Sequence, residues 1–319
     1  MVHHFGYGGS IWWLGPYGVQ IFFVISGFVI TNSAQDVTPT GFLKSRFIRL
    51  APSIWICGSA TLIVLALRGQ TDLGRSAINT LILWPFGPWL DRVYWSLPVE
   101  IVFYTAVFLM LVARKSVELL LRGLAAMSAL YWLFEIYATS TGGHCHGLIL
   151  LPFGGEFALG GLLYLCIAEK RIAGRAVFIA IAVAASLTQI IFQATREAVA
   201  VPLAASLLWL AATTAIVAAA HWNDAATRLF ARQAKVVRLI GLATYPLYLL
   251  HHEVGVAAIT VLGASPWLVM AMMIAASIGV AAYIEPVIQR GLKAWLSLLA
   301  SSSPYSVGKS AVPQRADHR

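Results

Sequence analysis

The chain has 319 residues, of which 59% are hydrophobic and 11% are charged, whereas a soluble domain carries about 25% charged residues. Its net charge of +9 does not indicate nucleic-acid binding, because the basic residues are scattered between apolar segments and form no single basic face. The composition therefore excludes an ordinary soluble domain and predicts an all-α, polytopic transmembrane helix bundle.

Apolar segments of roughly 20 residues predict the membrane-spanning helices. We expect about nine spans, near 17–32, 49–67, 95–113, 120–139, 148–167, 175–193, 200–220, 237–257 and 266–288. Together they form one membrane-embedded domain over residues 1–300. The polar segment 301–319 is rich in Ser, Lys and Arg, and we expect it to be a disordered cytoplasmic tail.

The distribution of basic residues predicts the orientation of the bundle. Of the 22 Lys and Arg residues, 18 lie in segments on one side of the predicted spans. The other side holds only Arg68, Arg75, Arg92 and Arg196. Cytoplasmic segments carry the excess of Lys and Arg, so we expect the C-terminus in the cytoplasm. With nine spans, residue 1 then lies outside.

A carboxylate lies inside an apolar helix, in the stretch 94–104. Ser96, Glu100 and Tyr104 are spaced by four residues, so a helix places them on one face. A carboxylate within a membrane helix is costly unless it has a partner or a function. The stretch therefore predicts either a polar active-site face or a structural arrangement, in which Ser96 caps the helix and Glu100 pairs with an arginine.

Two arginines stand at the start of the second predicted span. Arg46 and Arg49 are three residues apart and share a helix face. They either anchor the helix at the cytoplasmic surface or bind phosphate, which guanidinium groups hold in a bidentate manner.

Adjacent histidines follow a tyrosine near the C-terminal end of the chain. Tyr248 and His251 are three residues apart and share a face, whereas His252 points about 100° away. A histidine in apolar sequence is often a satisfied core group, but neutral imidazole also suits a general base near neutral pH.

Three other features are interpreted as structural or remain open. Ser26 and Gly27 form a small pair that favours close helix packing. Glu156 is the embedded acid, among several, that could line a cavity. The consecutive residues His144, Cys145 and His146 cannot easily converge on one ion, so no metal site is predicted.

Four stretches taken together resemble the acyltransferase-3 family of bacterial integral-membrane acyltransferases. The stretches are 17–30 (YGVQIFFVISGFVI), 46–52 (RFIRLAP), 95–104 (WSLPVEIVFY) and 244–251 (TYPLYLLH). The resemblance spans nearly the whole chain and implies a bundle of ten helices in the bacterial inner membrane. It also implies transfer of an acyl group, commonly acetyl from acetyl-CoA, to a hydroxyl group of a lipid-linked or periplasmic carbohydrate, with no bound cofactor.

The resemblance also suggests roles for single residues. His3 or His4 is the candidate general base, and Arg46 and Arg49 would bind the CoA phosphates. The remaining candidates would orient, polarise or bind the substrates: His251, Glu100, Tyr104, Trp95, Ser96 and Tyr248.

The start of the chain departs from the family pattern, in which a first helix carries an Arg, then ten residues, then a His. His3 or His4 matches this histidine, but the Arg and most of the helix are absent. We therefore expect a truncated start, since a restored helix would give ten spans with both ends inside. Two alternatives remain: a proton-coupled secondary transporter that uses Glu100 and His251, and a non-catalytic subunit of polysaccharide export.

Overall fold

The computed structural model describes residues 17–144, 148–196, 202–223, 227–228 and 231–301, and this part of the chain is helical without strands. The α-helices are α1 (Gly18–Ser33), α2 (Pro39–Leu67), α3 (Gly74–Leu81), α4 (Ser96–Val112), α5 (Val117–Ser140), α6 (Gly154–Ala168), α7 (Ala176–Arg196), α8 (Pro202–His221), α10 (Ala234–Leu250), α11 (Glu253–Leu262), α12 (Pro266–Gly279) and α13 (Glu285–Ser301). Short 3-10 helices occupy Arg92–Trp95, Leu151–Phe153 and Ala231–Gln233, and a π-helical segment occupies Val280–Ile284.

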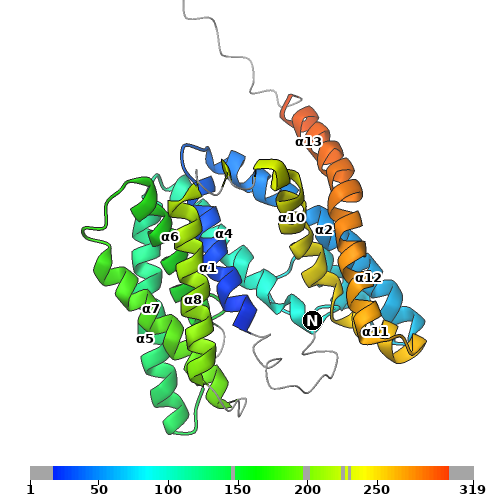
Figure 1. The fold of residues 1–319 in the computed structure, drawn as a ribbon, viewed down its shortest axis with the longest axis horizontal. Helices are drawn as coiled ribbons and strands as arrows, with labels where there is room; N and C mark the ends of the chain where they lie inside the picture. Colours follow the sequence, from blue (N-terminus) through cyan, green and yellow to red (C-terminus); the bar gives the residue numbers. More distant parts are fainter. Residues whose placement is uncertain (1–16, 145–147, 197–201, 224–226, 229–230, 302–319) are drawn as a thin grey trace, which may run out of the picture.

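The helices form two groups that lie side by side (Figure 1). The first helix group consists of α1, α5, α6, α7 and α8, which contact one another. The second helix group consists of α2, α3, α10, α11, α12 and α13. Helix α4 joins the two, because it contacts α1 and α5 on one side and α2 on the other.

Glycines set the close packing of α1 against α6 in the first helix group. A Cβ atom added at Gly160 would overlap the backbone carbonyl of Val24, and one added at Gly27 would overlap that of Phe157. Small residues allow helix backbones to approach in this way, and van der Waals packing then holds membrane helices together. The packing role predicted for Gly27 agrees with this arrangement.

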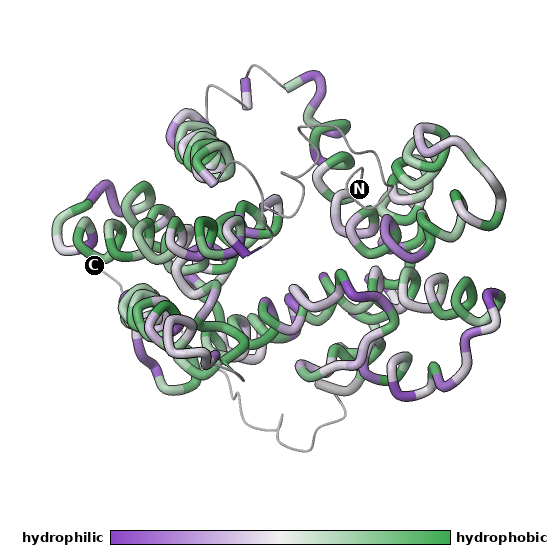
Figure 2. The backbone as a smooth tube through the Cα atoms, turned by 90° about the horizontal axis from the view of Figure 1, so that it is seen from below, coloured by the Kyte–Doolittle hydropathy of each residue, from purple (hydrophilic) through white to green (hydrophobic). Residues whose placement is uncertain are grey.

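Within the described residues, seven helices are long and apolar enough to cross a membrane. They are Pro39–Leu67, Arg92–Val112, Val117–Ser140, Leu151–Ala168, Ala176–Arg196, Pro202–His221 and Pro266–Leu298. Figure 2 shows hydrophobic colouring along much of the helical tube. Helix α1 is apolar but has only 16 residues. The predicted all-α polytopic bundle is confirmed, although the helix boundaries differ from the expected ones.

Two boundaries differ in ways that matter for the site. The span expected over 237–257 is interrupted, because α10 ends at Leu250 and α11 begins at Glu253. The last span continues ten residues beyond the expected position 288, through the π-helical segment into α13. Side-chain interactions described below explain the first difference.

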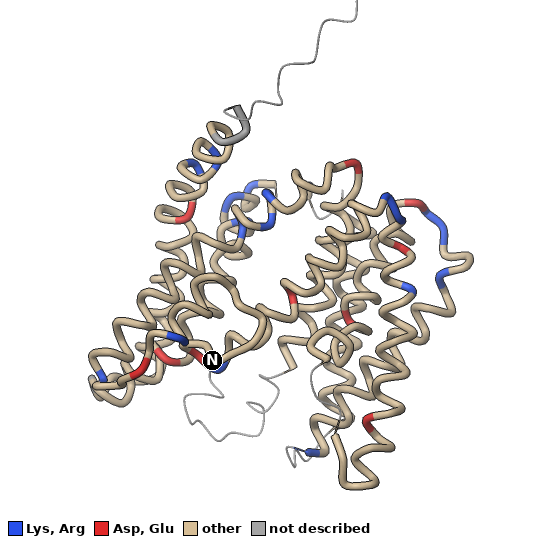
Figure 3. Tube along the Cα trace, turned by 180° about the vertical axis from the view of Figure 1, so that it is seen from behind, with Lys and Arg blue, Asp and Glu red and all other residues tan. Residues whose placement is uncertain are grey.

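The charged residues lie mostly near the ends of the helices (Figure 3). One cluster links α5, α6 and α7: Arg175 pairs with Glu118 at 2.7 Å and with Glu169 at 2.5 Å, and Glu118 also pairs with Arg122. The buried Arg175 further donates to the backbone carbonyls of Leu165 and of Arg171. These contacts tie the first helix group together at its predicted cytoplasmic end.

Candidate functional site

Glu100 lies where the two helix groups meet, and it is almost completely buried. Its carboxylate accepts hydrogen bonds from the Ser26 hydroxyl of α1 at 2.8 Å and from the Tyr104 hydroxyl one turn along α4. The predicted shared face of Ser96, Glu100 and Tyr104 is therefore present. Ser26, interpreted from the sequence as a packing residue, is a direct partner of the carboxylate.

The structural alternative for this stretch does not describe what is observed. No arginine in the described part of the chain lies within ion-pair distance of Glu100, and Ser96 makes no capping hydrogen bond to the backbone of α4. Arg46 and Arg49 act on Glu100 only at longer range, through their charge. Hydroxyl groups thus hold the carboxylate, and this leaves it a hydrogen-bond acceptor within a low-dielectric interior.

One turn further out, Ser96 contacts the end of α10. Its hydroxyl lies 2.7 Å from the Tyr248 hydroxyl, which also donates to the Val93 carbonyl. The His251 Nδ1 atom lies 2.7 Å from the backbone carbonyl of Tyr248, and the two rings are 5.7 Å apart. The structure therefore brings Ser96 to Tyr248 and the neighbouring His251, although Ser96 and Tyr248 are 152 residues apart in the sequence.

Trp95 borders this polar region with its indole ring. The ring is half-buried and packs at centroid distances of 6.3 Å from Phe23 and 5.2 Å from Phe153. Phe23 also packs on Phe157. Trp95 thus belongs to an aromatic cluster that connects α1, α4 and α6 beside the Glu100 face.

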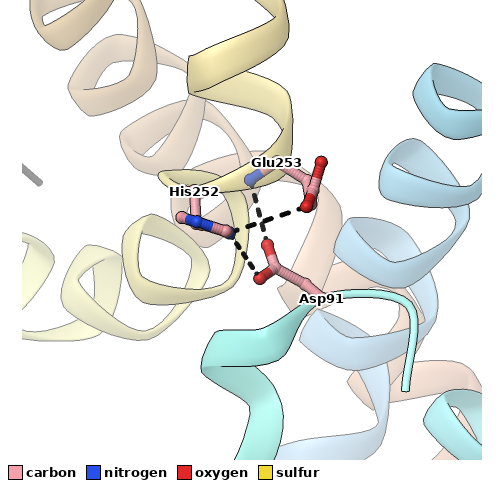
Figure 4. A group of neighbouring side chains, drawn as sticks. All are labelled: Asp91, His252 and Glu253. Carbon is pink, nitrogen blue, oxygen red and sulfur yellow. Dashed lines mark hydrogen bonds and ion pairs between the residues drawn. The ribbon is translucent and has the colours of Figure 1, made fainter. Parts of the chain in front are cut away.

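The break between α10 and α11 is held by a carboxylate from the segment before α4 (Figure 4). The buried Asp91 accepts a hydrogen bond from His252 Nδ1 at 2.8 Å and one from the backbone N–H of Glu253 at 3.0 Å. It also accepts one from the Val93 N–H. Because the side chain of Asp91 binds the first backbone N–H of α11, it explains why one helix stops here and another starts.

The same contacts shift the pKa values of Asp91 and His252, which lie outside the described helices that are long and apolar enough to span a membrane. The hydrogen bond to Asp91 raises the pKa of His252, against the effect of burial. Burial acts to raise the pKa of Asp91, but the hydrogen bonds from His252 and the two backbone N–H groups lower it overall. The ionised pair is therefore favoured around neutral pH. Asp91 was not identified from the sequence, although its position just before the Tyr94–Tyr104 stretch is a usable signal.

Asp91, His252 and Glu253 have the chemistry of a metal site as well. Their ligand atoms lie within 4.8 Å of one another. However, Glu253 pairs with Arg68 at 3.3 Å, and the carboxylate oxygens of Asp91 each accept hydrogen bonds. Protein groups therefore account for the cluster.

The two arginines of α2 differ in their surroundings. Arg46 is partly exposed, with its guanidinium 5.9 Å from the Phe42 ring and its Nε 3.2 Å from the Ser45 hydroxyl. Arg49 faces the second helix group, where it lies 3.9 Å from the Glu285 carboxylate and 5.9 Å from the Tyr245 ring. The remaining candidates, His3 and His4, lie outside the described residues.

The polar groups form one series along the seam between α2, α4 and α10. It begins with Arg46 and Arg49 near the start of α2, continues through the Glu100 face and ends at the α10–α11 break. Such an arrangement can bind an anion at one end and a polar group at the other. Its carboxylate, imidazoles and hydroxyls are groups that can accept or donate protons.

These features define a helical membrane protein with an embedded polar site. A model of the acyltransferase-3 family, described as an acyltransferase domain, matches residues 1–285. The chain therefore belongs to this family of membrane O-acyltransferases and is an enzyme, as the four sequence stretches predicted. The match favours this function over the transporter alternative. Neither the curated proteins nor the solved structures contain a match to the chain.

Proposed function

We propose that this membrane O-acyltransferase moves an acyl group, most simply acetyl, from acyl-CoA to a hydroxyl group of a cell-surface or exported carbohydrate. The observation that carries the proposal is the Glu100 carboxylate, buried between the helix groups and held by the hydroxyls of Ser26 and Tyr104. A membrane-embedded carboxylate with hydrogen-bond partners but no ion-pair partner among the described residues is typical of a functional site.

The orientation of the site supports a donor and an acceptor on opposite sides of the bacterial inner membrane. The distribution of Lys and Arg supports a cytoplasmic position for the start of α2, with Arg46, on the side where CoA is present. The α10–α11 break then lies toward the outer face, where a lipid-linked or periplasmic carbohydrate is accessible. The same excess of Lys and Arg supports a cytoplasmic C-terminus.

His251 is our candidate general base within the described part of the chain. A hydrogen on Nδ1 is donated to the Tyr248 carbonyl, and this tautomer leaves the lone pair on Nε2. The base accepts the proton of the acceptor hydroxyl while the oxygen of that hydroxyl attacks the thioester carbonyl. The C–S bond then breaks, and the departing CoA thiolate takes up a proton. His3 or His4 is the alternative base, and an acyl-histidine intermediate is the alternative to direct attack.

The other residues would bind and orient the substrates. Glu100 and Tyr104 would position the acceptor or polarise the base, and Ser96 and Tyr248 would form hydrogen bonds to the carbohydrate. Trp95 offers an aromatic surface, which suits the apolar face of a sugar ring.

The decisive experiment is an acyl-transfer assay with the purified chain in lipid nanodiscs. Radiolabelled acetyl-CoA is the donor, a membrane extract supplies lipid-linked carbohydrate, and mass spectrometry locates the added group. We expect label in the carbohydrate with the wild type, and at least about a hundredfold less with Glu100→Gln. Wild-type protein that transfers no acyl group from any acyl-CoA would favour the non-catalytic alternative.

A further inference from the structure

Two reciprocal hydrogen bonds join the short 3-10 helix Arg92–Trp95 to the last turn of α10. The Tyr94 hydroxyl donates to the Leu249 carbonyl at 3.0 Å, and the Tyr248 hydroxyl donates to the Val93 carbonyl. In each bond the donor residue is the chain neighbour of the acceptor residue of the other bond. We call this arrangement the tyrosine clamp, which consists of Val93, Tyr94, Tyr248 and Leu249.

The Tyr94 hydroxyl also contacts a third helix. Its oxygen lies 3.1 Å from the hydroxyl of Thr61 in α2, and both side chains are almost completely buried. A tyrosine hydroxyl carries one hydrogen, and here that hydrogen goes to the Leu249 carbonyl, so Thr61 is the donor in their contact. Removal of the Tyr94 oxygen would therefore take a partner from a buried acceptor and from a buried donor at once, which is costly.

The tyrosine clamp lies between two groups of the proposed catalytic site. The 3-10 helix continues directly into α4, which carries Glu100. On the other side, His251 follows the end of α10, and its Nδ1 atom lies 2.7 Å from the Tyr248 carbonyl. The clamp therefore connects the helix that carries the carboxylate to the turn that orients the imidazole.

The last turn of α10 needs this support because the helix stops at Leu250. The final carbonyls of a helix have no intrahelical donors, and a helix end opens more readily than its middle. Tyr94 supplies a donor to one of these carbonyls, that of the buried Leu249. The neighbouring carbonyl, that of Tyr248, binds the imidazole of His251, so a movement of this turn moves the imidazole.

We propose that Tyr94 is a positioning residue for acyl transfer, which acts through the Leu249 carbonyl to keep His251 in its productive orientation. In this role Tyr94 need not touch either substrate. The inference rests on the proposed function, because it concerns the candidate base of the same reaction.

The test is steady-state acyl transfer by the purified full chain in lipid nanodiscs. Tyr94→Phe removes one oxygen atom, and we expect kcat to fall about thirtyfold, because a small misplacement of a catalytic group has a large effect on rate. The KM values for acetyl-CoA and for the carbohydrate should stay within about twofold. A loss that appears in the two KM values and leaves kcat unchanged would contradict the positioning role.

A double-mutant cycle with His251→Ala distinguishes positioning from general damage. If Tyr94 acts through His251, the addition of Tyr94→Phe should lower the residual kcat of His251→Ala by no more than about twofold. Losses that multiply would show that the two residues act independently, and this result would overturn the inference.

The matched control is Thr61→Val. It removes the other hydroxyl of the same buried contact and leaves the bond from Tyr94 to Leu249 in place. We expect kcat of this variant to stay within about twofold of the wild type. Equal kcat losses in Thr61→Val and Tyr94→Phe would indicate damage to the packing and overturn the inference.

A second variant is available if Tyr94→Phe fails to fold. Tyr248→Phe breaks the reciprocal bond to Val93, and kcat is its readout because the Tyr248 hydroxyl also contacts Ser96. Its kcat loss should disappear in the His251→Ala background. A kcat loss that persists in that background would overturn the role of the clamp.

The remaining outcomes distinguish the inference from the proposed function. Wild-type protein that transfers no acyl group counts against the function itself. An active wild type with an unchanged kcat in Tyr94→Phe overturns the inference alone. An active His251→Ala variant with a normal kcat also overturns it, because Tyr94 then has no base to position.

Discussion

The two helix groups use buried polar residues differently. In the second helix group and α4, polar side chains contact one another across helices, from Arg49 and Glu285 to Ser96 and Tyr248. In the first helix group, Glu156 is fully buried and neither carboxylate oxygen has a hydrogen-bond partner among the described residues. The packing of the first helix group depends on glycines, on the Gln20–Gln193 hydrogen bond between α1 and α7, and on the Glu118–Arg175 cluster at one end.

This difference suggests that the first helix group is mainly a scaffold and that chemistry is confined to the seam. Helix α1 links the two roles, because one face packs on α6 while Ser26 reaches Glu100. A substitution in the scaffold should therefore change stability, and a substitution on the Glu100 face of the seam should change activity with little effect on stability.

The largest effect is expected for Gly160→Ala. The added methyl group would overlap the Val24 carbonyl of α1, and backbone cannot move aside as a flexible side chain can. We expect a loss of stability of about 3 kcal/mol, which thermal unfolding in detergent would measure. The control is Gly123→Ala in α5, where nothing lies near the added atom and a small gain in stability is expected. Equal stability of the two variants would refute the scaffold role of this contact.

Next in size is the contrast between two buried carboxylates. Glu100→Gln should lower kcat at least about a hundredfold while the unfolding temperature stays nearly constant. Glu156→Gln, at the same level of burial but outside the polar series, should keep activity within about threefold. Acyl-transfer assays and thermal unfolding on both proteins provide the comparison. A larger activity loss for Glu156→Gln would locate the chemistry in the first helix group.

The sequence was sufficient for features that depend on local periodicity. Apolar segments predicted the membrane helices, and a spacing of four predicted the common face of Ser96, Glu100 and Tyr104. Partners that depend on long-range packing could not be predicted. Asp91, Tyr245 and Glu285 lie far from their partners in the sequence, and no periodic pattern connects them. The α10–α11 break was missed for the same reason, because its cause is a carboxylate about 160 residues earlier.

A smaller effect, with a pH dependence, is expected for Asp91→Asn. The raised pKa of His252 means that its contribution to stability is complete below its ordinary value of 6.5 and is lost as the pH rises through the raised value. The lowered pKa of Asp91 means that its contribution is present above 3.8 and is lost as the pH falls through the lowered value. The ion pair of Asp91 and His252 therefore stabilises the folded protein most between pH 3.8 and pH 6.5.

We expect Asp91→Asn to lower the free energy of unfolding by about 2 kcal/mol near pH 5.5 and by clearly less near pH 9. Unfolding temperatures across this range test it. Other charged or titratable groups around His252 are His251, Glu253 and Arg92, and they could also change the stability with pH. The control is therefore Asp91→Asn in a His252→Gln background, where the pH dependence of its cost should vanish. A cost that is independent of pH would show that the ion pair does not contribute.

The smallest effect is expected at the hydroxyl pair of Ser96 and Tyr248. Ser96→Ala removes one partner of a 2.7 Å hydrogen bond, whereas the Tyr248 hydroxyl keeps its contact with the Val93 carbonyl. We therefore expect KM for the carbohydrate to rise about fivefold, with KM for acetyl-CoA unchanged. Steady-state kinetics with each substrate varied in turn would measure this. A rise in KM for acetyl-CoA instead would indicate that Ser96 binds the acyl donor and not the carbohydrate.

The interruption after Leu250 has a consequence for how variants of this site should be interpreted. A helix that stops leaves its last carbonyl oxygens without intrahelical donors. Here the Tyr94 hydroxyl donates to the Leu249 carbonyl, and the His251 ring binds the Tyr248 carbonyl. The His251 imidazole therefore also helps to cap the C-terminal end of α10. His251→Ala would both loosen the end of α10 and remove the candidate base. Faster amide hydrogen exchange in 248–256 would report the loosening, so this measurement separates it from the loss of the base.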